Sequence, residues 1–114
     1  MAKKIEIVNP MTIQIGDKTY TLEFNVDSVI AAERLGLNLA NFEDMPLGTT
    51  LLLFYCAFKM HHPEMTRTQT DKIYFDDLNG MTPEEIKRLG ELFNAPAQYL
   101  VNDGGERKNA KISL

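Results

Sequence analysis

The sequence is poor in the features that mark disulfide-rich, secreted and membrane proteins. It contains a single cysteine, Cys56, so an intrachain disulfide scaffold is excluded and a reducing compartment is favoured. Its longest apolar run, residues 51–58, is far shorter than the roughly 20 residues that span a bilayer. The opening MAKKIEIVNP lacks the apolar segment of roughly 7–15 residues that a secretory signal carries. These absences predict a cytoplasmic protein with no membrane partner.

Motifs for catalysis and for cofactor binding are also missing. No serine or cysteine nucleophile stands in a recognisable motif with histidine, and no glycine-rich phosphate loop follows a predicted strand. His61 and His62, with Cys56 and Glu64 nearby, form the one cluster with metal-binding residue types. Adjacent helical residues point about 100° apart, whereas a zinc pair on a helix needs i, i+4 spacing. We therefore expect no enzyme, no cofactor and no metal site.

The charge of the chain is unevenly distributed. The formal net charge is −4, but residues 5–106 hold 16 acidic and only 7 basic side chains. The remaining basic residues lie near the two ends, at positions 3, 4, 107, 108 and 111. An acidic body argues against sequence-independent binding to nucleic acid, which needs a basic face. We therefore expect no nucleic-acid partner.

The stretch LGTTLLLFYCAFKMHH, residues 47–62, is apolar nearly all round when it is placed on a helix. At about 100° per residue, one stripe joins Leu47, Leu51, Phe54, Tyr55 and Phe58. Such a helix is either wrapped by its own domain or shared with another chain, because water cannot be left against so much apolar surface. We predict that it is the central core helix.

A second stripe on this helix exceeds what one small hairpin could cover. It consists of Leu53, Cys56, Ala57 and Met60, and Met65 lies just beyond it. Methionine-rich apolar surfaces adapt to varied partners. We therefore predict a partner-binding or oligomer interface at these five residues. The alternative, that other helices of the same chain cover the stripe, stays open.

Two period-2 segments near the start of the chain predict a β-hairpin. Residues 12–15 and 19–24 alternate apolar and polar side chains around Gly16, which can take the positive φ of a tight turn. The apolar members would share one face of the hairpin. Residues 3–8 are available as a third, edge strand that Pro10 ends.

Start and stop signals predict the bounds of the first helix and of the central helix. Asn25 is a good N-cap for a first helix, which ends near Gly36. Asp44, placed before Pro46, is the expected cap of the central helix. That helix should end at Pro63, because proline removes a backbone donor.

Further signals predict the helices that follow. Thr68 or Thr70 is the expected start of a third helix, which stops at the Asn-Gly pair of residues 79–80. TPEE at residues 82–85 carries a capping box for a fourth helix, and Pro96 predicts a break before a short last helix. The predicted fold class is α+β, with an N-terminal antiparallel hairpin of two or three strands packed on four to five helices. We expect one domain over residues 1–102 and a mobile tail over 103–114.

Three groups of segments follow one another in a recognisable order. They are YTLEFN at residues 20–25 running into DSV at 27–29, LFYCAF at 53–58 followed by HHP at 61–63, and LFNAP at 92–96 with Lys-Asn at 108–109. In this order the chain resembles the small tail assembly chaperones that long-tailed bacteriophages and prophages of Gram-positive bacteria encode. The resemblance spans nearly the whole chain.

The resemblance implies a non-enzymatic protein in the cytoplasm of the bacterial host. Such a chaperone coats the tape measure protein, keeps its hydrophobic helices soluble, and helps to recruit tail tube protein before it is released. It also tends to form homo-oligomers. Two other classes stay open: a structural tail component that remains in the virion, and a small cytoplasmic regulatory binding protein.

Overall fold

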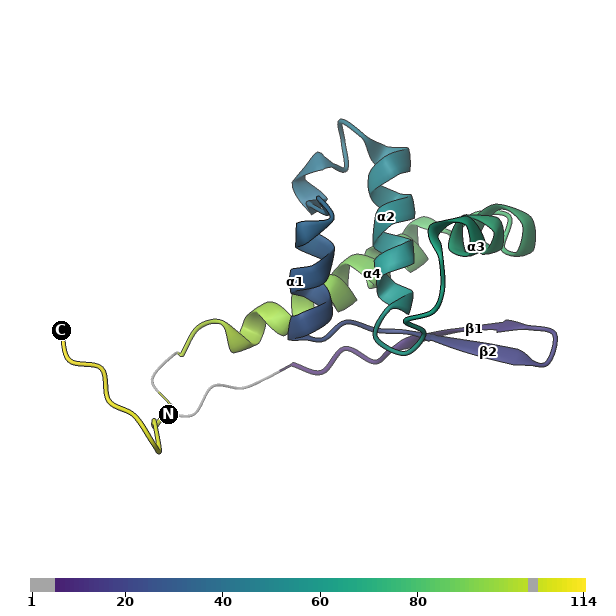
Figure 1. Cartoon of the computed structure of the whole chain (residues 1–114). Coiled ribbons are helices and arrows are strands. Elements are labelled where there is room, and N and C mark those ends of the chain that lie inside the picture. Colours follow the sequence, from purple (N-terminus) through teal and green to yellow (C-terminus); the bar gives the residue numbers. More distant parts are fainter. Residues whose placement is uncertain (1–5, 103–104) are drawn as a thin grey trace.

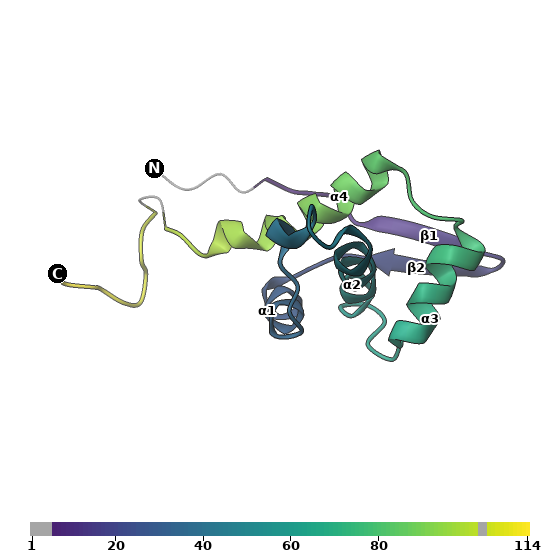
Figure 2. The ribbon, with the colours of Figure 1, turned by 90° about the horizontal axis from the view of Figure 1, so that it is seen from above.

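The computed structural model describes residues 6–102 and 105–114. Figure 1 shows α1 and α2 standing side by side, with the two-stranded hairpin extending from beneath the lower end of α2. Figure 2, turned by 90°, shows these two helices nearly end-on and flanked by α3 and α4. The predicted α+β class is confirmed.

The elements in chain order are β1 (Met11–Ile15), β2 (Lys18–Leu22), α1 (Val26–Arg34), the 3-10 helix η1 (Leu39–Asn41), α2 (Pro46–Phe58), α3 (Arg67–Lys72), the π-helical η2 (Ile73–Asp77), α4 (Pro83–Asn94) and the 3-10 helix η3 (Ala95–Tyr99).

The hairpin forms where the alternation predicts it. β1 and β2 pair antiparallel with Ile13 opposite Tyr20 and Met11 opposite Leu22, and Gly16 takes a φ of 61° in the two-residue turn. Ile13 and Leu22 are buried against the helices. Residues 6–8 of the predicted third strand form no strand, and residues 3–5 lie outside the described part of the chain.

The central helix α2 carries the core. It packs against α1, α3, α4 and β2, and Phe54 and Phe58 are fully buried. Their rings meet edge-on with centroids 5.0 Å apart, and the ring of Tyr74 meets Phe54 in the same way at 5.2 Å. The prediction of a central core helix is confirmed.

The C-terminal end of α2 is hydrogen-bonded to the strand region beneath it. The amide of Glu23 donates to the carbonyl oxygen of Ala57 at 3.0 Å, and the amide of Thr21 donates to Nε2 of His62 at 2.9 Å. A helix leaves its last carbonyl groups without intrahelical partners, so the chain beside β2 satisfies a group that the core would otherwise bury unpaired. These two bonds fix the helix relative to the hairpin.

Three of the predicted helix start and stop signals are present in the structure. Asn25 caps α1 in a reciprocal capping box with Ser28, and Thr82 caps α4 in the same way with Glu85. The stop at residues 79–80 is also present, because Asn79 and Gly80 take φ values of 53° and 88°.

Four predicted boundaries are wrong, the last of them only in part. Met45 occupies the N-cap of α2 and no side chain caps it, so Asp44 does not have the expected role. α2 ends at Phe58, well before Pro63, and a turn over residues 59–61 follows. The amide of Glu23, which is distant in sequence, donates to the carbonyl oxygen of Ala57, so this carbonyl is not left for a further helical turn. Thr66, which forms a capping box with Gln69, starts α3 in place of Thr68 or Thr70.

The fourth boundary is wrong only in part. α4 ends at Asn94 and a short last helix, η3, follows it as predicted, but Ala95 keeps a helical conformation, so no non-helical residue separates the two. Residues 105–114 form neither helix nor strand, and residues 103–104 of the predicted tail lie outside the described part of the chain. None of the helices in the described ranges is long and apolar enough to cross a membrane.

The second stripe of the central helix lies inside the molecule. Leu53, Cys56 and Ala57 are at most 2% exposed and Met65 is 8% exposed, whereas Met60 is 37% exposed. Four of the five residues of the predicted interface are therefore buried within this chain, and only Met60 is exposed. The helices α1, α3 and α4 cover it, which the helical period alone could not reveal.

This placement predicts opposite outcomes for two charged substitutions on the same stripe. Ala57→Arg should lower the free energy of unfolding by several kcal/mol, because it buries an unpaired charge in a filled core. Met60→Lys should change the free energy of unfolding by less than about 1 kcal/mol, because its side chain reaches water. Urea denaturation followed by circular dichroism measures both. A cooperative, near-native transition for Ala57→Arg would show that the stripe faces outward.

Candidate functional site: an apolar groove between α1 and η3

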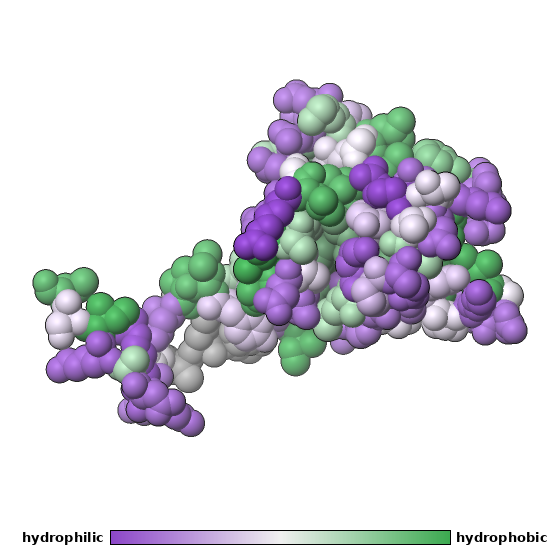
Figure 3. Space-filling model, in the orientation of Figure 1, coloured by the Kyte–Doolittle hydropathy of each residue, from purple (hydrophilic) through white to green (hydrophobic). Residues whose placement is uncertain are grey.

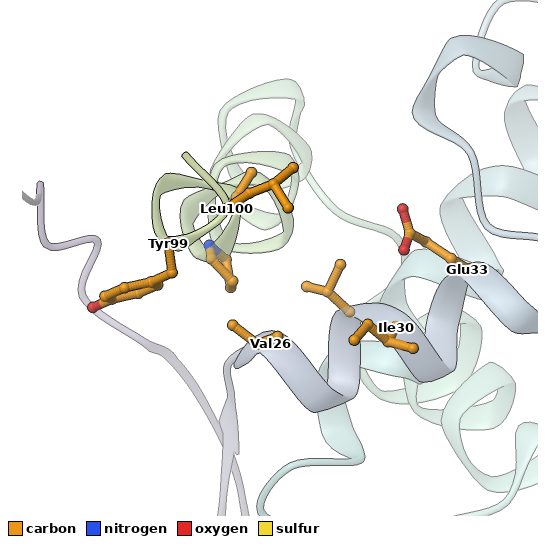
Figure 4. A pocket seen from close by; sticks show the side chains of 8 residues that line it. Val26, Ile30, Glu33, Tyr99 and Leu100 are labelled. Carbon is orange, nitrogen blue, oxygen red and sulfur yellow. The ribbon is translucent and has the colours of Figure 1, made fainter. Parts of the chain in front are cut away.

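An apolar groove of about 260 Å³ lies between α1 and η3. Val26 and Ile30 are 44% and 40% exposed, and Leu100 is 84% exposed. Figure 4 shows Val26 and Ile30 on one side and Leu100 on the other, with Tyr99 and Glu33 at opposite ends. The full lining is Val26, Val29, Ile30, Glu33, Pro96, Ala97, Tyr99 and Leu100.

The groove arises from two local features of the sequence. The capping box at Asn25 starts α1 so that positions 26, 29, 30 and 33 share one face at i, i+3, i+4 and i+7. Pro96 is buried, and it turns the end of α4 into the 3-10 helix η3, which carries Tyr99 and Leu100 past that face. Figure 3 shows hydrophobic surface beside α1, toward the segment that leaves the body.

A second hollow of about 300 Å³ adjoins the groove and shares Val26, Pro96 and Tyr99 with it. One of its walls is the segment of residues 6–8, which the side-chain amide of Gln98 holds in place. The amide of Glu6 donates to Oε1 of Gln98 at 2.7 Å, and Nε2 of Gln98 donates to the carbonyl oxygen of Glu6 at 2.9 Å. Ile7 and Met60 add apolar surface here.

The charged side chains that line the two hollows are all acidic. Glu33 lines the groove, and Glu6 and Glu23 line the adjoining hollow. Within the described ranges, no lysine or arginine lines either one. Glu23 is engaged by His61, whose Nε2 lies 2.7 Å from Oε1 of Glu23. An apolar groove with an acidic rim can bind apolar side chains that are flanked by basic ones.

The volume of the groove also limits its ligand. Sites for small molecules usually enclose roughly 300–1,000 Å³. A hollow of about 260 Å³ that is open at the surface has room for a few side chains of another polypeptide. Hydrogen-bonding groups that would orient a small substrate are scarce in its lining. The groove is therefore mainly apolar, with Glu33 as the one charged side chain in its described lining.

The residues singled out from the sequence do not meet in this groove. Leu53, Cys56, Ala57 and Met65 lie in the core, and only Met60 reaches the adjoining hollow. Val26, Val29 and Ile30 form an apolar stripe in the sequence of the first helix, and sequence reasoning assigned no site to it. The missed signal is that this face continues to Glu33, and a carboxylate at i+7 of an apolar stripe indicates access to water.

The two histidines have structural contacts. His62 accepts the amide hydrogen of Thr21, and its ring lies against Tyr20 with centroids 5.2 Å apart. His61 pairs with Glu23 on the surface. Among the described residues, no group of three His, Cys, Asp or Glu side chains is placed to hold a metal ion. Both histidines therefore join the end of α2 to the chain around β2.

Substitution of these histidines should separate the half-buried hydrogen bond of His62 from the exposed contact of His61 with Glu23. His62→Phe keeps a ring in place but leaves the half-buried amide of Thr21 without an acceptor, so it should cost about 1–2 kcal/mol of unfolding free energy. His61→Ala removes an exposed pair and should cost less than about 1 kcal/mol. Urea denaturation at pH 8 compares the two. Equal losses would mean that the bond to Thr21 does not stabilise the fold.

The thiol of Cys56 has low reactivity near neutral pH. Burial raises the pKa of its thiol to about 11, although nearby Arg67 and Lys59 act to lower it. The thiolate is the reactive form, so almost none is present near neutral pH.

Alkylation tests this placement of Cys56. Iodoacetamide at pH 8 should modify the native chain very slowly and the urea-unfolded chain at the rate of a free cysteine, measured by intact mass. Native and unfolded chains that react at equal rates would contradict a buried thiol.

Comparison with known proteins identifies one family. No curated protein matches the chain, and no solved structure matches it. Residues 1–114 match a family described as a domain of unknown function, DUF5055, and the chain belongs to that family.

Proposed function

We propose that this chain is a tail assembly chaperone of a long-tailed bacteriophage or prophage. In this proposal it works without catalysis in the cytoplasm of the bacterial host. It binds apolar helices of the tape measure protein and assists assembly of the tail tube around them. The observation that supports the proposal best is the apolar groove between α1 and η3.

The groove has the properties that a binder of amphipathic helices needs. An amphipathic helix docks by placing anchors at i, i+3, i+4 or i+7 into a hydrophobic groove, and the face of α1 that holds Val26 and Ile30 has the same spacing. Solvent-exposed Val26, Ile30 and Leu100 would lose water when a client covers them. The acidic side chain of Glu33 would meet basic residues beside those anchors.

The remaining surface suits a chaperone with broad specificity. Met60 is 37% exposed beside the groove, and its unbranched side chain can adapt to clients of different shape. The net negative charge of residues 5–106 would keep a chaperone–client complex soluble through repulsion between complexes.

Two other classes make different predictions. A structural tail component would be present in purified virions, whereas a chaperone would be absent from them. A small regulatory binding protein would be encoded away from tail genes, whereas a tail chaperone would be encoded close to a tape measure gene. The apolar groove alone is compatible with all three.

Co-expression with the tape measure protein of the same phage or prophage tests the proposal. The wild-type chain should move the client from the insoluble to the soluble fraction. Ile30→Glu should weaken this effect about tenfold or more, because it places a charge in the apolar groove beside Glu33. Leu35→Glu is the matched control, because Leu35, the C-cap residue of the same helix, is 57% exposed but does not line the groove.

The comparison depends on both variants being folded, which circular dichroism and urea denaturation establish first. Equal client solubility with and without the wild-type chain would refute the chaperone assignment. Equal activity of Ile30→Glu and wild type would refute the groove as the client site.

A further inference from the structure

Residues 107–114 have a composition complementary to the groove. This segment, RKNAKISL, carries Arg107, Lys108 and Lys111 and no acidic residue. Its apolar side chains are exposed, with Ile112 at 64% and Leu114 fully accessible. Figure 3 shows hydrophobic atoms at the outer tip of this segment, away from the body. The groove is complementary to this segment, because its floor is also apolar and its rim carries the opposite charge.

We infer that the groove of one copy of this chain binds residues 107–114 of a second copy. The spacing of the apolar side chains supports this pairing. Ile112 and Leu114 lie two residues apart in an extended chain, so they are separated by roughly 6.6 Å on one side. Val26 and Ile30 are one helical turn apart on α1, which is about 6 Å along the axis.

The charges set the direction of the bound segment. Glu33 lies beyond Ile30, toward the C-terminal end of α1. A segment that runs antiparallel to α1 places Ile112 over Ile30 and Leu114 over Val26. Lys111 then lies at the Glu33 end of the groove, and its side chain points away from the apolar floor, toward the rim. The reverse direction would carry Lys111 away from that carboxylate.

The structure favours exchange between copies over folding back within one chain. The side chain of Asn102 accepts from the amide of Gly105 at 2.7 Å and donates to its carbonyl oxygen at 3.1 Å. Beyond this point the segment runs outward from the body, as Figure 1 shows. Its apolar tip is thus presented to a neighbouring molecule.

The exchange must be weak. A stable interface between proteins buries roughly 1,200–2,000 Å², which a segment of eight residues cannot supply alone. If the proposed function is correct, a client helix would displace the segment and separate the copies. The self-association itself does not depend on that function and is measured without a client.

Two full-length variants test the exchange, because each one disables one of the two contacting parts, either the apolar tip or the groove. Ile112→Asp with Leu114→Asp removes the apolar tip and keeps the groove, and Ile30→Glu disables the groove and keeps the tip. Light scattering should show the average mass of wild type rising with concentration, while each variant alone stays monomeric. Mixing the variants should restore the association, because the intact tip of one meets the intact groove of the other. Leu35→Glu should associate like wild type.

A peptide measures the same contact directly. A fluorescein-labelled peptide of residues 105–114 is titrated into the Ile112→Asp, Leu114→Asp variant and followed by fluorescence anisotropy. Binding should saturate, weaken about tenfold or more when Ile30→Glu is added, and weaken about two- to fivefold with Glu33→Gln. A wild-type chain that stays monomeric at all concentrations, a mixture that fails to associate, or peptide binding unaffected by Ile30→Glu would overturn the inference.

Discussion

The fold depends on covering α2, a helix that has almost no polar face. Its sequence forces the rest of the chain to surround it: α1, α3 and α4 pack on it, and β2 lies at its C-terminal end. The amide of Glu23 completes this enclosure by satisfying the carbonyl of Ala57. Because so much of the chain is committed to α2, the outer face of α1 is covered only in part, by η3. The groove with Val26 and Ile30 is the consequence.

This arrangement separates stability from binding. Phe54, Phe58 and Ala57 are inaccessible and hold the core together. The groove residues lie on the other side of α1, so substitutions there change a surface without opening a cavity. A helix-binding protein requires this separation, because its exposed apolar side chains must remain available while the body stays folded. The acidic charge of the body opposes the aggregation that such exposure invites.

The sequence predicts those features whose causes are local. The hairpin at Gly16 and the capping boxes at Asn25 and Thr82 depend on a few adjacent residues, and all three are present. The early end of α2 was not predictable, because a distant amide ends it. The site was missed for a related reason: helical periodicity identifies apolar faces but not what covers them, and Val26 and Leu100 meet only in the folded chain.

The central claim is that the face formed by α1 and η3 binds apolar helices. Chemical-shift mapping tests it most directly, with the isotope-labelled chain titrated by a soluble peptide from an amphipathic helix of the tape measure protein. The account predicts that amide and methyl signals of Val26, Val29, Ile30 and Leu100 shift most, while those of Leu53 and Phe58 hardly move. Shifts centred on another surface, such as the exposed edge of β1, or no shifts at saturating peptide, would contradict it.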